Sequence, residues 1–301
     1  MRIKKENYEN KIVYGDANWV LRKIPNESID LVLTSPPYFG CREYDDDNSG
    51  LGREHDPNDY INNIVSTIHR IFPLLKNSGS LYLNLGDVYF GTKGFSRTTG
   101  KWVRKTSQQY KDYQIVEEDG KYLQHKQRLM LPERIAIILQ NKGWILRNNI
   151  ILEKLNPLPC HSKDRRLPVY ENMFHFVKKQ KYFFNYDRAK ELNHHRDVIK
   201  YSVEPYEDHL ATFPEKLISP FIETTCPENG IVLDPFLGSG TVAKVSLDLN
   251  RRFIGIELNK KYCELAKKKI EKSSGIFQST INVNIVEVLR KGKKNGTEKH
   301  S

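Results

Sequence analysis

Short apolar segments that suit buried strands alternate with amphipathic segments that suit helices, and no other feature of the sequence limits the fold as strongly. Near the start, strands are expected at 11–17, 28–34 and 80–87, and a periodic segment that begins at Pro57 is expected to be a helix. From Ile231 onward the alternation returns. Strands that alternate with helices pair in parallel, so the sequence predicts an α/β fold with a doubly wound, mostly parallel sheet.

Two basic, irregular segments interrupt this pattern. Residues 88–128 mix Gly, Thr, Ser, Lys and Arg with aromatic residues, and residues 186–207 are polar and lack periodicity. Long stretches of this kind within a compact domain are either functional or disordered. Regular elements are expected at 131–143, 144–154 and 171–179, and residues 281–288 are compatible with an edge strand.

Composition restricts the setting in which the protein works. The formal net charge of +11 fits a polyanionic partner, although an ordinary basic protein would look the same. The four cysteines form no CxxC pair, and the histidines lack the spacing of metal ligands, so we expect a reducing cytoplasm and no metal. We expect no membrane partner, because no apolar run is long enough to span a bilayer and the first residues lack a secretory signal.

The segment "IVLDPFLGSGT" predicts a ligand site at a strand end. Gly238 and Gly240 lie between the strand that ends at Asp234 and the next helix, where a ligand can approach the backbone. About 20 residues later, Glu257 ends the following strand, a position suited to binding the two hydroxyls of a ribose. A nucleotide-like ligand fits this pattern; the alternative is a tight turn with an unrelated surface glutamate.

The segment "LVLTSPPYFG" is a buried strand that two prolines end abruptly. Pro36 and Pro37 contribute no backbone donors, and they make the carbonyls around them rigid. Taken alone, this segment fits a Pro-Pro turn beside a core tyrosine as well as it fits a functional site.

Together, "TSPPY" and "DPFLGSGT" resemble the motifs of S-adenosylmethionine-dependent DNA amino-methyltransferases, in the order of the circularly permuted β type. "GDA", "LNLGD", "NPLPCHSKDRRLPVYENMFHFVK", "HLATFPEKLI" and "GIELNKKYCELA" extend the resemblance over most of residues 11–270. It implies a circularly permuted, Rossmann-like sheet. It also implies a catalytic half (1–87), a basic DNA-contacting insertion (88–128), the rest of the catalytic half (129–185), a target-recognition segment (186–208), a cofactor-binding half (209–275) and a basic C-terminal extension (276–301).

The resemblance assigns residues to S-adenosylmethionine. Glu257 would bind the ribose, and Asp16 the adenine amino group, although Asp16 also fits a simple Gly-Asp turn. Asp87 of "LNLGD" is equally ambiguous. The residues implied to bind the cofactor are Asp16, Thr34, Thr212, Phe213, Asp234, Pro235, Phe236, Gly238, Ser239, Gly240, Thr241, Glu257 and Leu258.

Ser35, Pro36, Pro37 and Tyr38 are the residues to which the resemblance gives the chemistry. The amino group of a base is a weak nucleophile, because its lone pair is delocalised into the ring. The Ser35 hydroxyl and the stiff Pro36 carbonyl, here called the amine clamp, would hold its hydrogens. Tyr38 would stack on a base rotated out of the duplex. In this family Ser at the first clamp position is common in cytosine-N4 enzymes and Asp in adenine-N6 enzymes, so cytosine N4 is favoured and adenine N6 is the alternative.

Double-stranded DNA is the implied partner. Its phosphates would bind Lys101, Arg104, Lys105, Lys163, Arg165 and Arg166, although the last three also fit a solvated turn. An RNA or protein-amide methyltransferase and a non-enzymatic nucleic-acid binder are less favoured alternatives. The recognised sequence, a companion restriction endonuclease and the oligomeric state stay open.

Overall fold

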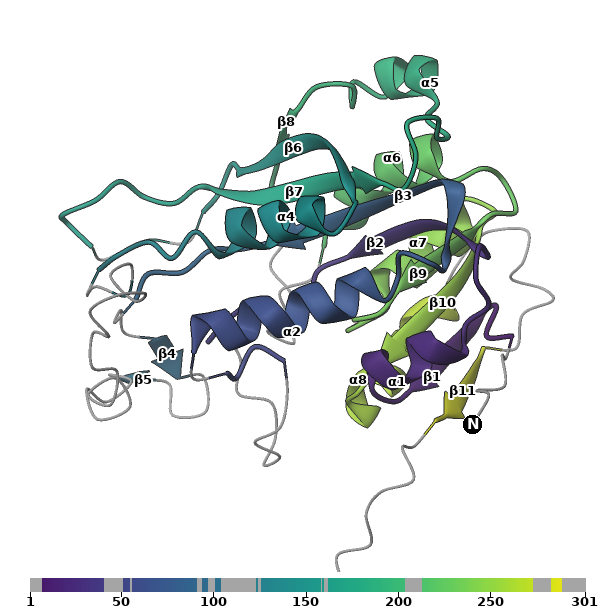
Figure 1. The fold of residues 1–301 in the computed structure, drawn as a ribbon, viewed down its shortest axis with the longest axis horizontal. Helices are drawn as coiled ribbons and strands as arrows, with labels where there is room; N and C mark the ends of the chain where they lie inside the picture. The colour runs from purple at the N-terminus through teal and green to yellow at the C-terminus, as the bar shows by residue number, and fades with distance from the viewer. Residues whose placement is uncertain are drawn as a thin grey trace, which may run out of the picture.

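The computed structural model describes residues 7–40, 51–54, 56–90, 94–96, 101–103, 123, 126–157, 159, 162–203, 213–272 and 283–288 (Figure 1). Nine strands of this described part form one sheet: β1 (Lys11–Tyr14), β2 (Ile29–Thr34), β3 (Leu75–Leu85), β6 (Ile145–Lys154), β7 (Tyr170–Val177), β8 (Val198–Tyr201), β9 (Ile231–Asp234), β10 (Arg252–Glu257) and β11 (Asn284–Glu287). A separate antiparallel pair consists of β4 (Gly94–Ser96) and β5 (Lys101–Val103).

The order of the strands in the main sheet is β11-β1-β10-β9-β2-β3-β7-β6-β8. Strand β7 runs antiparallel to β3 and β6, and the other described neighbours pair in parallel, which confirms the mostly parallel sheet. Strands from the two ends of the chain interleave, because β1 lies between β10 and β11 and β2 lies between β9 and β3. Strand β1 therefore belongs spatially to the cofactor half, although it lies within residues 1–87.

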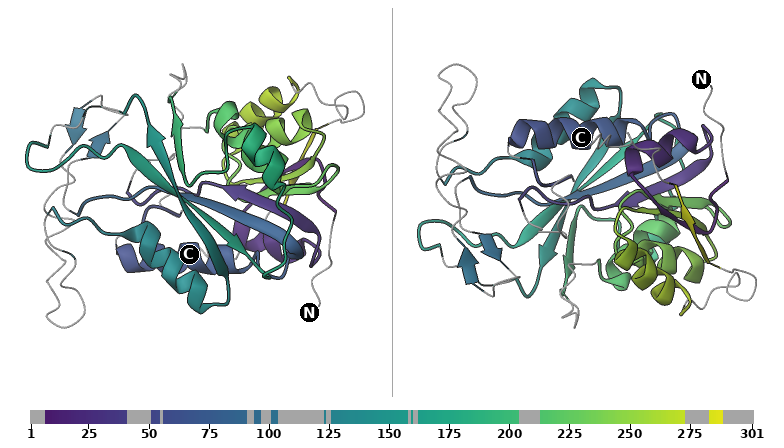
Figure 2. Two further views of the ribbon diagram at one scale, coloured as in Figure 1. Left: turned by 90° about the horizontal axis from the view of Figure 1, so that it is seen from above. Right: turned by 90° about the horizontal axis from the view of Figure 1, so that it is seen from below.

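Helices cover both faces of this sheet, as the doubly wound prediction requires (Figure 2). The first core cluster packs α1 (Ala17–Val20), α2 (Pro57–His69) and α4 (Leu131–Asn141) on one face. The other two clusters pack α6 (Glu215–Thr225), α7 (Thr241–Asp248) and α8 (Lys260–Ile270) on the opposite face. Strand β2 is buried between the two layers, since Val32 belongs to the first cluster and Leu31 and Leu33 belong to the second.

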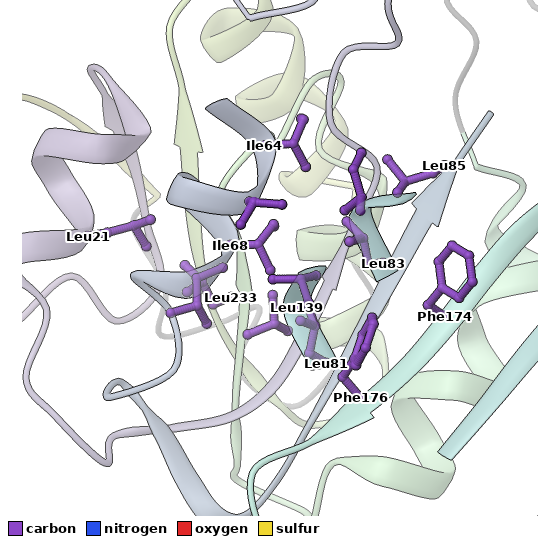
Figure 3. Close-up of a cluster of buried hydrophobic side chains, with 14 of the residues drawn as sticks. Leu21, Ile64, Ile68, Leu81, Leu83, Leu85, Leu139, Phe174, Phe176 and Leu233 are labelled. Atoms are coloured by element: carbon purple, nitrogen blue, oxygen red, sulfur yellow. The ribbon is translucent and has the colours of Figure 1, made fainter. Parts of the chain in front are cut away.

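The first core cluster holds α2 and α4 on the sheet (Figure 3). Ile64 and Ile68 of α2 are fully buried, and they lie on the apolar stripe that the sequence predicted. Helix α2 begins where its sequence indicates, because the Asp56 side chain accepts a hydrogen bond from the backbone amide of Asn58 and Pro57 takes the first helical position. This packing holds β2, which leads into the serine-proline segment, and its neighbour β3 in place.

Residues 186–208 are more regular than expected. They contain α5 (Tyr186–Glu191) and the edge strand β8, which pairs in parallel with β6. The edge strand expected within 281–288 is β11. Most of the segment 88–128 lies outside the described residues. No helix in the described part of the chain is long and apolar enough to cross a membrane.

Candidate active site

The serine-proline segment and the glycine loop meet at one edge of the sheet. Strands β2 and β9 are parallel neighbours, with Val32 opposite Leu233, so both segments leave the sheet at the carboxyl ends of adjacent strands. The Thr34 hydroxyl donates a hydrogen bond of 2.7 Å to Asp234 Oδ1, and both side chains are buried. One hydrogen bond therefore joins Thr34, the residue before Ser35, to Asp234, the first residue of the glycine loop (234–240), across 200 positions of sequence.

Two carboxylate side chains hold the glycine loop through its backbone amides. Asp234 Oδ1 also accepts the Phe236 amide at 3.0 Å, and Glu257 Oε2 accepts the Gly238 amide at 2.8 Å. Gly238 adopts φ 55°, and among the described residues a Cβ placed there would meet only the Phe236 carbonyl oxygen, at 3.9 Å. A Cβ at Gly240 would lie 2.8 Å from the Ala266 Cβ of α8. Gly238 thus leaves open space for a ligand, whereas Gly240 allows α8 to pack closely.

Two acidic residues stand beside this loop at the ends of adjacent strands. Tyr14 of β1 pairs with Glu257 of β10, and Asp16 follows two residues after Tyr14. Glu257 is half-buried and also accepts the Asn259 amide, while exposed Asp16 caps α1 through the Trp19 amide at 3.0 Å. Carboxylate oxygens accept hydrogen bonds from hydroxyl and amino groups, so both side chains suit such groups of a ligand.

The other residues implied to bind a cofactor differ in their surroundings. The side chain of Leu258 is 56% exposed beside Glu257. Ser239 and Thr241 are buried, and both contact Lys269 Nζ of α8, at 3.3 and 2.8 Å. Phe213 packs on the second core cluster, Pro235 is buried and Phe236 is half-buried. Thr212 lies outside the described residues.

Burial dominates the electrostatics of Asp234. It raises the pKa of this carboxyl group to about 7, and the charge of Glu257 adds to the increase, against the lowering effect of the Thr34 hydrogen bond. Near neutral pH the group is therefore divided between its two protonation states.

Of the two proline carbonyls in the serine-proline segment, that of Pro37 already accepts a hydrogen bond. The Tyr60 hydroxyl of α2 donates to the Pro37 carbonyl at 3.0 Å. Among the described residues no donor is bonded to the carbonyl of Pro36, so it is available to an incoming amino group together with half-buried Ser35. A Cβ at Gly86 would lie 2.5 Å from Tyr38 Cε2, so the absence of a side chain there lets the Tyr38 ring pack on the backbone after β3.

A network of polar side chains lies behind the amine clamp. The Tyr38 hydroxyl is 2.6 Å from Asn84 Oδ1 and 3.0 Å from Glu171 Oε2, and Ser35 Oγ is 3.2 Å from the same Asn84 oxygen. Glu171 Oε1 in turn binds Lys154 Nζ. The sequence analysis missed Asn84, Glu171 and Lys154; a polar residue within the apolar strand "LYLNL" was the available signal for Asn84.

Asp87 has a structural role. Its carboxylate accepts hydrogen bonds from the amides of Met130 and Leu131 at the start of α4, and from Arg128 Nε at 2.6 Å. With 3% of its side chain exposed, it has little contact with solvent. Capping of α4 accounts for this residue.

The basic residues expected at DNA are placed unevenly. Lys163 and Arg166 are exposed between β6 and β7, on the connection that leaves the same edge of the sheet as β2. Arg165 stacks on the Tyr89 ring, 3.8 Å from its centroid, so part of its side chain is engaged with the protein. For Lys101 the structure gives only the backbone, in β5, and Arg104 and Lys105 lie outside the described residues. No group of three His, Cys, Asp or Glu side chains suited to a metal occurs in the described part.

Comparisons with known proteins agree with this geometry. A family model of N6/N4 methyltransferases, described as DNA methylase, matches residues 29–268. The chain is 37% identical over 270 residues to the Type II methyltransferase M.SmaI of Serratia marcescens, covering 86% of this chain and 90% of the relative. It is 35% identical over 265 residues to the Type II methyltransferase M.XycI of Xanthomonas campestris pv. cyanopsidis, covering 85% and 86%.

Solved structures share the fold. A structure titled PvuII DNA methyltransferase (cytosine-N4-specific) has a TM-score of 0.66 at 19% identity and covers 89% of this chain and 88% of its own. TTHA0409, titled a putative DNA modification methylase from Thermus thermophilus in complex with S-adenosyl-L-methionine, has a TM-score of 0.64 at 22% identity, covering 93% and 99%. The match to residues 29–268 and the relatives above 30% identity show that the chain belongs to the N6/N4 DNA methylase family.

Proposed function

We propose that this protein methylates the N4 amino group of cytosine in double-stranded DNA, using S-adenosylmethionine and a base rotated out of the duplex. The observation that carries the proposal is the hydrogen bond of 2.7 Å between Thr34 and Asp234. It brings a site for an amino group and an open glycine loop to one edge of the sheet, as direct transfer between two bound molecules requires.

The glycine loop and its acidic neighbours hold the cofactor in this proposal. Glu257 accepts the ribose hydroxyls, Asp16 accepts the adenine amino group and exposed Leu258 covers the adenine ring. The open space at Gly238 admits the methionine end, which Asp234, Pro235, Phe236, Phe213 and Thr212 surround. The cofactor supplies an electrophilic methyl group on sulfur, which is transferred in one displacement without a covalent enzyme intermediate.

The amine clamp activates the nucleophile. Ser35 Oγ and the Pro36 carbonyl accept the two amino hydrogens and draw the nitrogen out of conjugation with the ring, where positive charge then develops. The Pro37 carbonyl cannot serve as easily, because Tyr60 already donates to it. Pro37 stiffens the segment, and Tyr38 contributes an aromatic surface next to the base.

DNA binding in this proposal depends on the carboxyl edge of the sheet and the basic segments beside it. Lys163 and Arg166 contact phosphates, Arg165 does so from its stacked position on Tyr89, and Lys101, Arg104 and Lys105 contribute from the insertion. The net charge of +11 favours a polyanion over a protein substrate. A restriction endonuclease of the same specificity is the partner expected in the cell, as in other modification systems of this type.

The experiment is methylation of duplex DNA of random sequence with labelled S-adenosylmethionine, followed by mass spectrometry of the nucleosides. N4-methylcytosine is expected; N6-methyladenine would establish the alternative base, and no methylated nucleoside would refute the proposal. Matched variants test the division of roles. Ser35→Ala should lower the single-turnover rate about 100-fold with cofactor affinity within about threefold, because it removes one preorganised acceptor of the amine. Glu257→Ala should weaken cofactor binding at least about tenfold in equilibrium dialysis.

A further inference from the structure

The polar network behind the amine clamp ends at a charged pair that the proposed chemistry has not used. Glu171 is the second residue of β7 and Lys154 is the last residue of β6, and their side chains are 19% and 26% exposed. Glu171 presents one carboxylate oxygen to Lys154 and the other to the Tyr38 hydroxyl. The clamp serine is therefore connected to an ion pair on neighbouring strands through Tyr38.

The directions of the hydrogen bonds in this network matter because the clamp serine must act as an acceptor. Ser35 Oγ has one proton, and it accepts a substrate hydrogen well only when that proton points away, towards Asn84 Oδ1 or the Tyr38 oxygen. Asn84 Nδ2 donates to the Asn172 carbonyl at 3.1 Å, which fixes Asn84 Oδ1 towards the two hydroxyls. Ser35 and Tyr38 therefore share one amide oxygen, at 3.2 and 2.6 Å, and two donors on one acceptor weaken each other's hydrogen bond.

Glu171 relieves this sharing. The Tyr38 hydroxyl is 2.6 Å from Asn84 Oδ1 and 3.0 Å from Glu171 Oε2, so its single proton is shared between the two oxygens. The carboxylate is the stronger acceptor and draws part of this bond away from Asn84 Oδ1, which leaves that oxygen a better acceptor for Ser35. Tyr38 keeps that proton at neutral pH, because burial, together with the charge of Glu171, raises its pKa well above the ordinary value. Lys154 can only donate, and it holds the carboxylate from the other side.

We propose that Glu171 is a positioning residue, which orients the Tyr38 hydroxyl so that Ser35 presents its lone pairs to the amino group of the substrate. This inference rests on the proposed function, and it applies equally to cytosine and adenine. Glu171 touches neither the substrate nor the cofactor; it acts through Tyr38. It needs Tyr38 to pass on the orientation, whereas Lys154 binds the second carboxylate oxygen and is not itself required for it.

Substitution by glutamine tests the orientation with almost no change of shape. In Glu171→Gln, Lys154 still requires an acceptor, so it takes the amide oxygen and turns the amide NH₂ towards Tyr38. Tyr38 must then donate fully to Asn84 Oδ1, which weakens the bond from Ser35 to the same oxygen and makes it easier for the Ser35 proton to turn towards the substrate. We expect the single-turnover rate of methyl transfer to fall at least about tenfold, while cofactor affinity changes less than about threefold.

A second substitution should restore the orientation. In Lys154→Met/Glu171→Gln the amide no longer faces an ammonium group, so it can rotate and offer its oxygen to Tyr38. We expect this double variant to be at least about threefold faster than Glu171→Gln. An ion pair with only a structural role predicts the opposite, because the double variant lacks both of its members. In a Tyr38→Phe background, Glu171→Gln should cause no further loss of rate.

Glu153→Gln is the matched control. Glu153 lies next to Lys154 on β6 and forms an ion pair with Lys200 of β8 at 3.6 Å. The Glu153 side chain has no contact with the Tyr38 network in the described structure, so the single-turnover rate of Glu153→Gln should equal that of the wild type. Thermal unfolding of every variant checks the fold.

The outcomes separate this inference from the proposed function. A Glu171→Gln rate equal to that of Glu153→Gln, or a double variant no faster than Glu171→Gln, would overturn the inference while leaving the methyltransferase proposal intact. A wild-type protein that methylates no DNA would remove both. If Glu171→Gln does not fold, Lys154→Met replaces it: the Glu171 carboxylate still faces Tyr38 in this variant, so we expect a rate within about threefold of the wild type, and a larger loss in a folded variant would contradict the inference.

Discussion

Asp234 is a single carboxyl group with neighbours from two parts of the site. It accepts a hydrogen bond from the hydroxyl of Thr34, which precedes the amine clamp, and another from the amide of Phe236, which lies in the glycine loop. A change at this residue therefore affects both binding sites, whereas Ser35 and Glu257 each belong to one of them. The ionisation of Asp234 also depends strongly on the fold, since burial raises its pKa to about 7.

This raised pKa predicts how stability depends on pH. Between about pH 4 and 7 the folded state keeps a proton on Asp234 that the unfolded state has released, so the free energy of unfolding falls as pH rises, by up to about 4 kcal/mol. Asp234→Asn keeps an acceptor for Thr34 and removes this titration. We expect its loss of stability from pH 5 to pH 8, measured by urea unfolding, to be smaller than that of the wild type. Exposed Asp197→Asn should follow the wild type, and a parallel decline in all three proteins would contradict the assignment.

Much of the site at this scale could be predicted from the sequence, because its residues lie in short motifs. Ser35 through Tyr38 and the loop after Asp234 were recognised from a few adjacent letters each. Glu171 was not, since it meets Tyr38 across 133 residues and nothing in its own neighbourhood indicates that contact. Contacts of this kind depend on strand order, which local patterns do not encode.

The connection between β6 and β7 is an element whose position carries functional weight. It leaves the same edge of the sheet as the amine clamp, and the Lys126–Asp164 ion pair of 2.6 Å ties it to the segment before α4. In the proposed function, its exposed Lys163 and Arg166 face the DNA backbone when a base reaches Ser35.

Salt dependence tests that placement. Each phosphate contact contributes about one unit to the slope of log affinity against log salt concentration. Lys163→Ala/Arg166→Ala should therefore reduce the slope by about two units, as measured by fluorescence anisotropy with labelled duplex DNA. Lys179→Ala/Lys181→Ala removes two exposed lysines beyond the other end of β7 and should leave the slope unchanged. Equal effects of the two pairs would show that the connection has no special role.

Regular elements followed the sequence where apolar periodicity was strong. Helix α2 and strands β2 and β9 were expected from their buried, repeating apolar residues, and the structure confirms them. Strand β8 was missed because its side chains alternate between exposed and half-buried at the sheet edge, and its sequence contains no run of core residues. Pairing with β6, which lies more than 40 positions earlier, determines its conformation.

At the scale of the whole molecule, the main sheet of nine strands is assembled from both ends of the chain. Strands β9 and β10 lie between β2 and β1, so neither end can complete its hydrogen bonding without the other. The core clusters also combine residues from both ends, such as Val32 and Leu233 of neighbouring strands.

This interleaving predicts cooperative unfolding. Circular dichroism of the helices and fluorescence of buried Trp144 should give the same melting temperature, because no group of strands forms a complete unit. S-adenosylmethionine should raise both midpoints together, by linkage to the folded state. Two separate transitions, with only one of them shifted by the cofactor, would indicate independent halves.

The position of β9 and β10 also has a consequence during protein synthesis. The ribosome completes β1, β2 and β3 long before the two strands that lie beside them in the finished sheet. A nascent or prematurely terminated polypeptide that stops before Ile231 contains the serine-proline segment but none of the glycine loop. Such a polypeptide lacks the loop to which we assign the cofactor, so we expect it to transfer no methyl group to DNA.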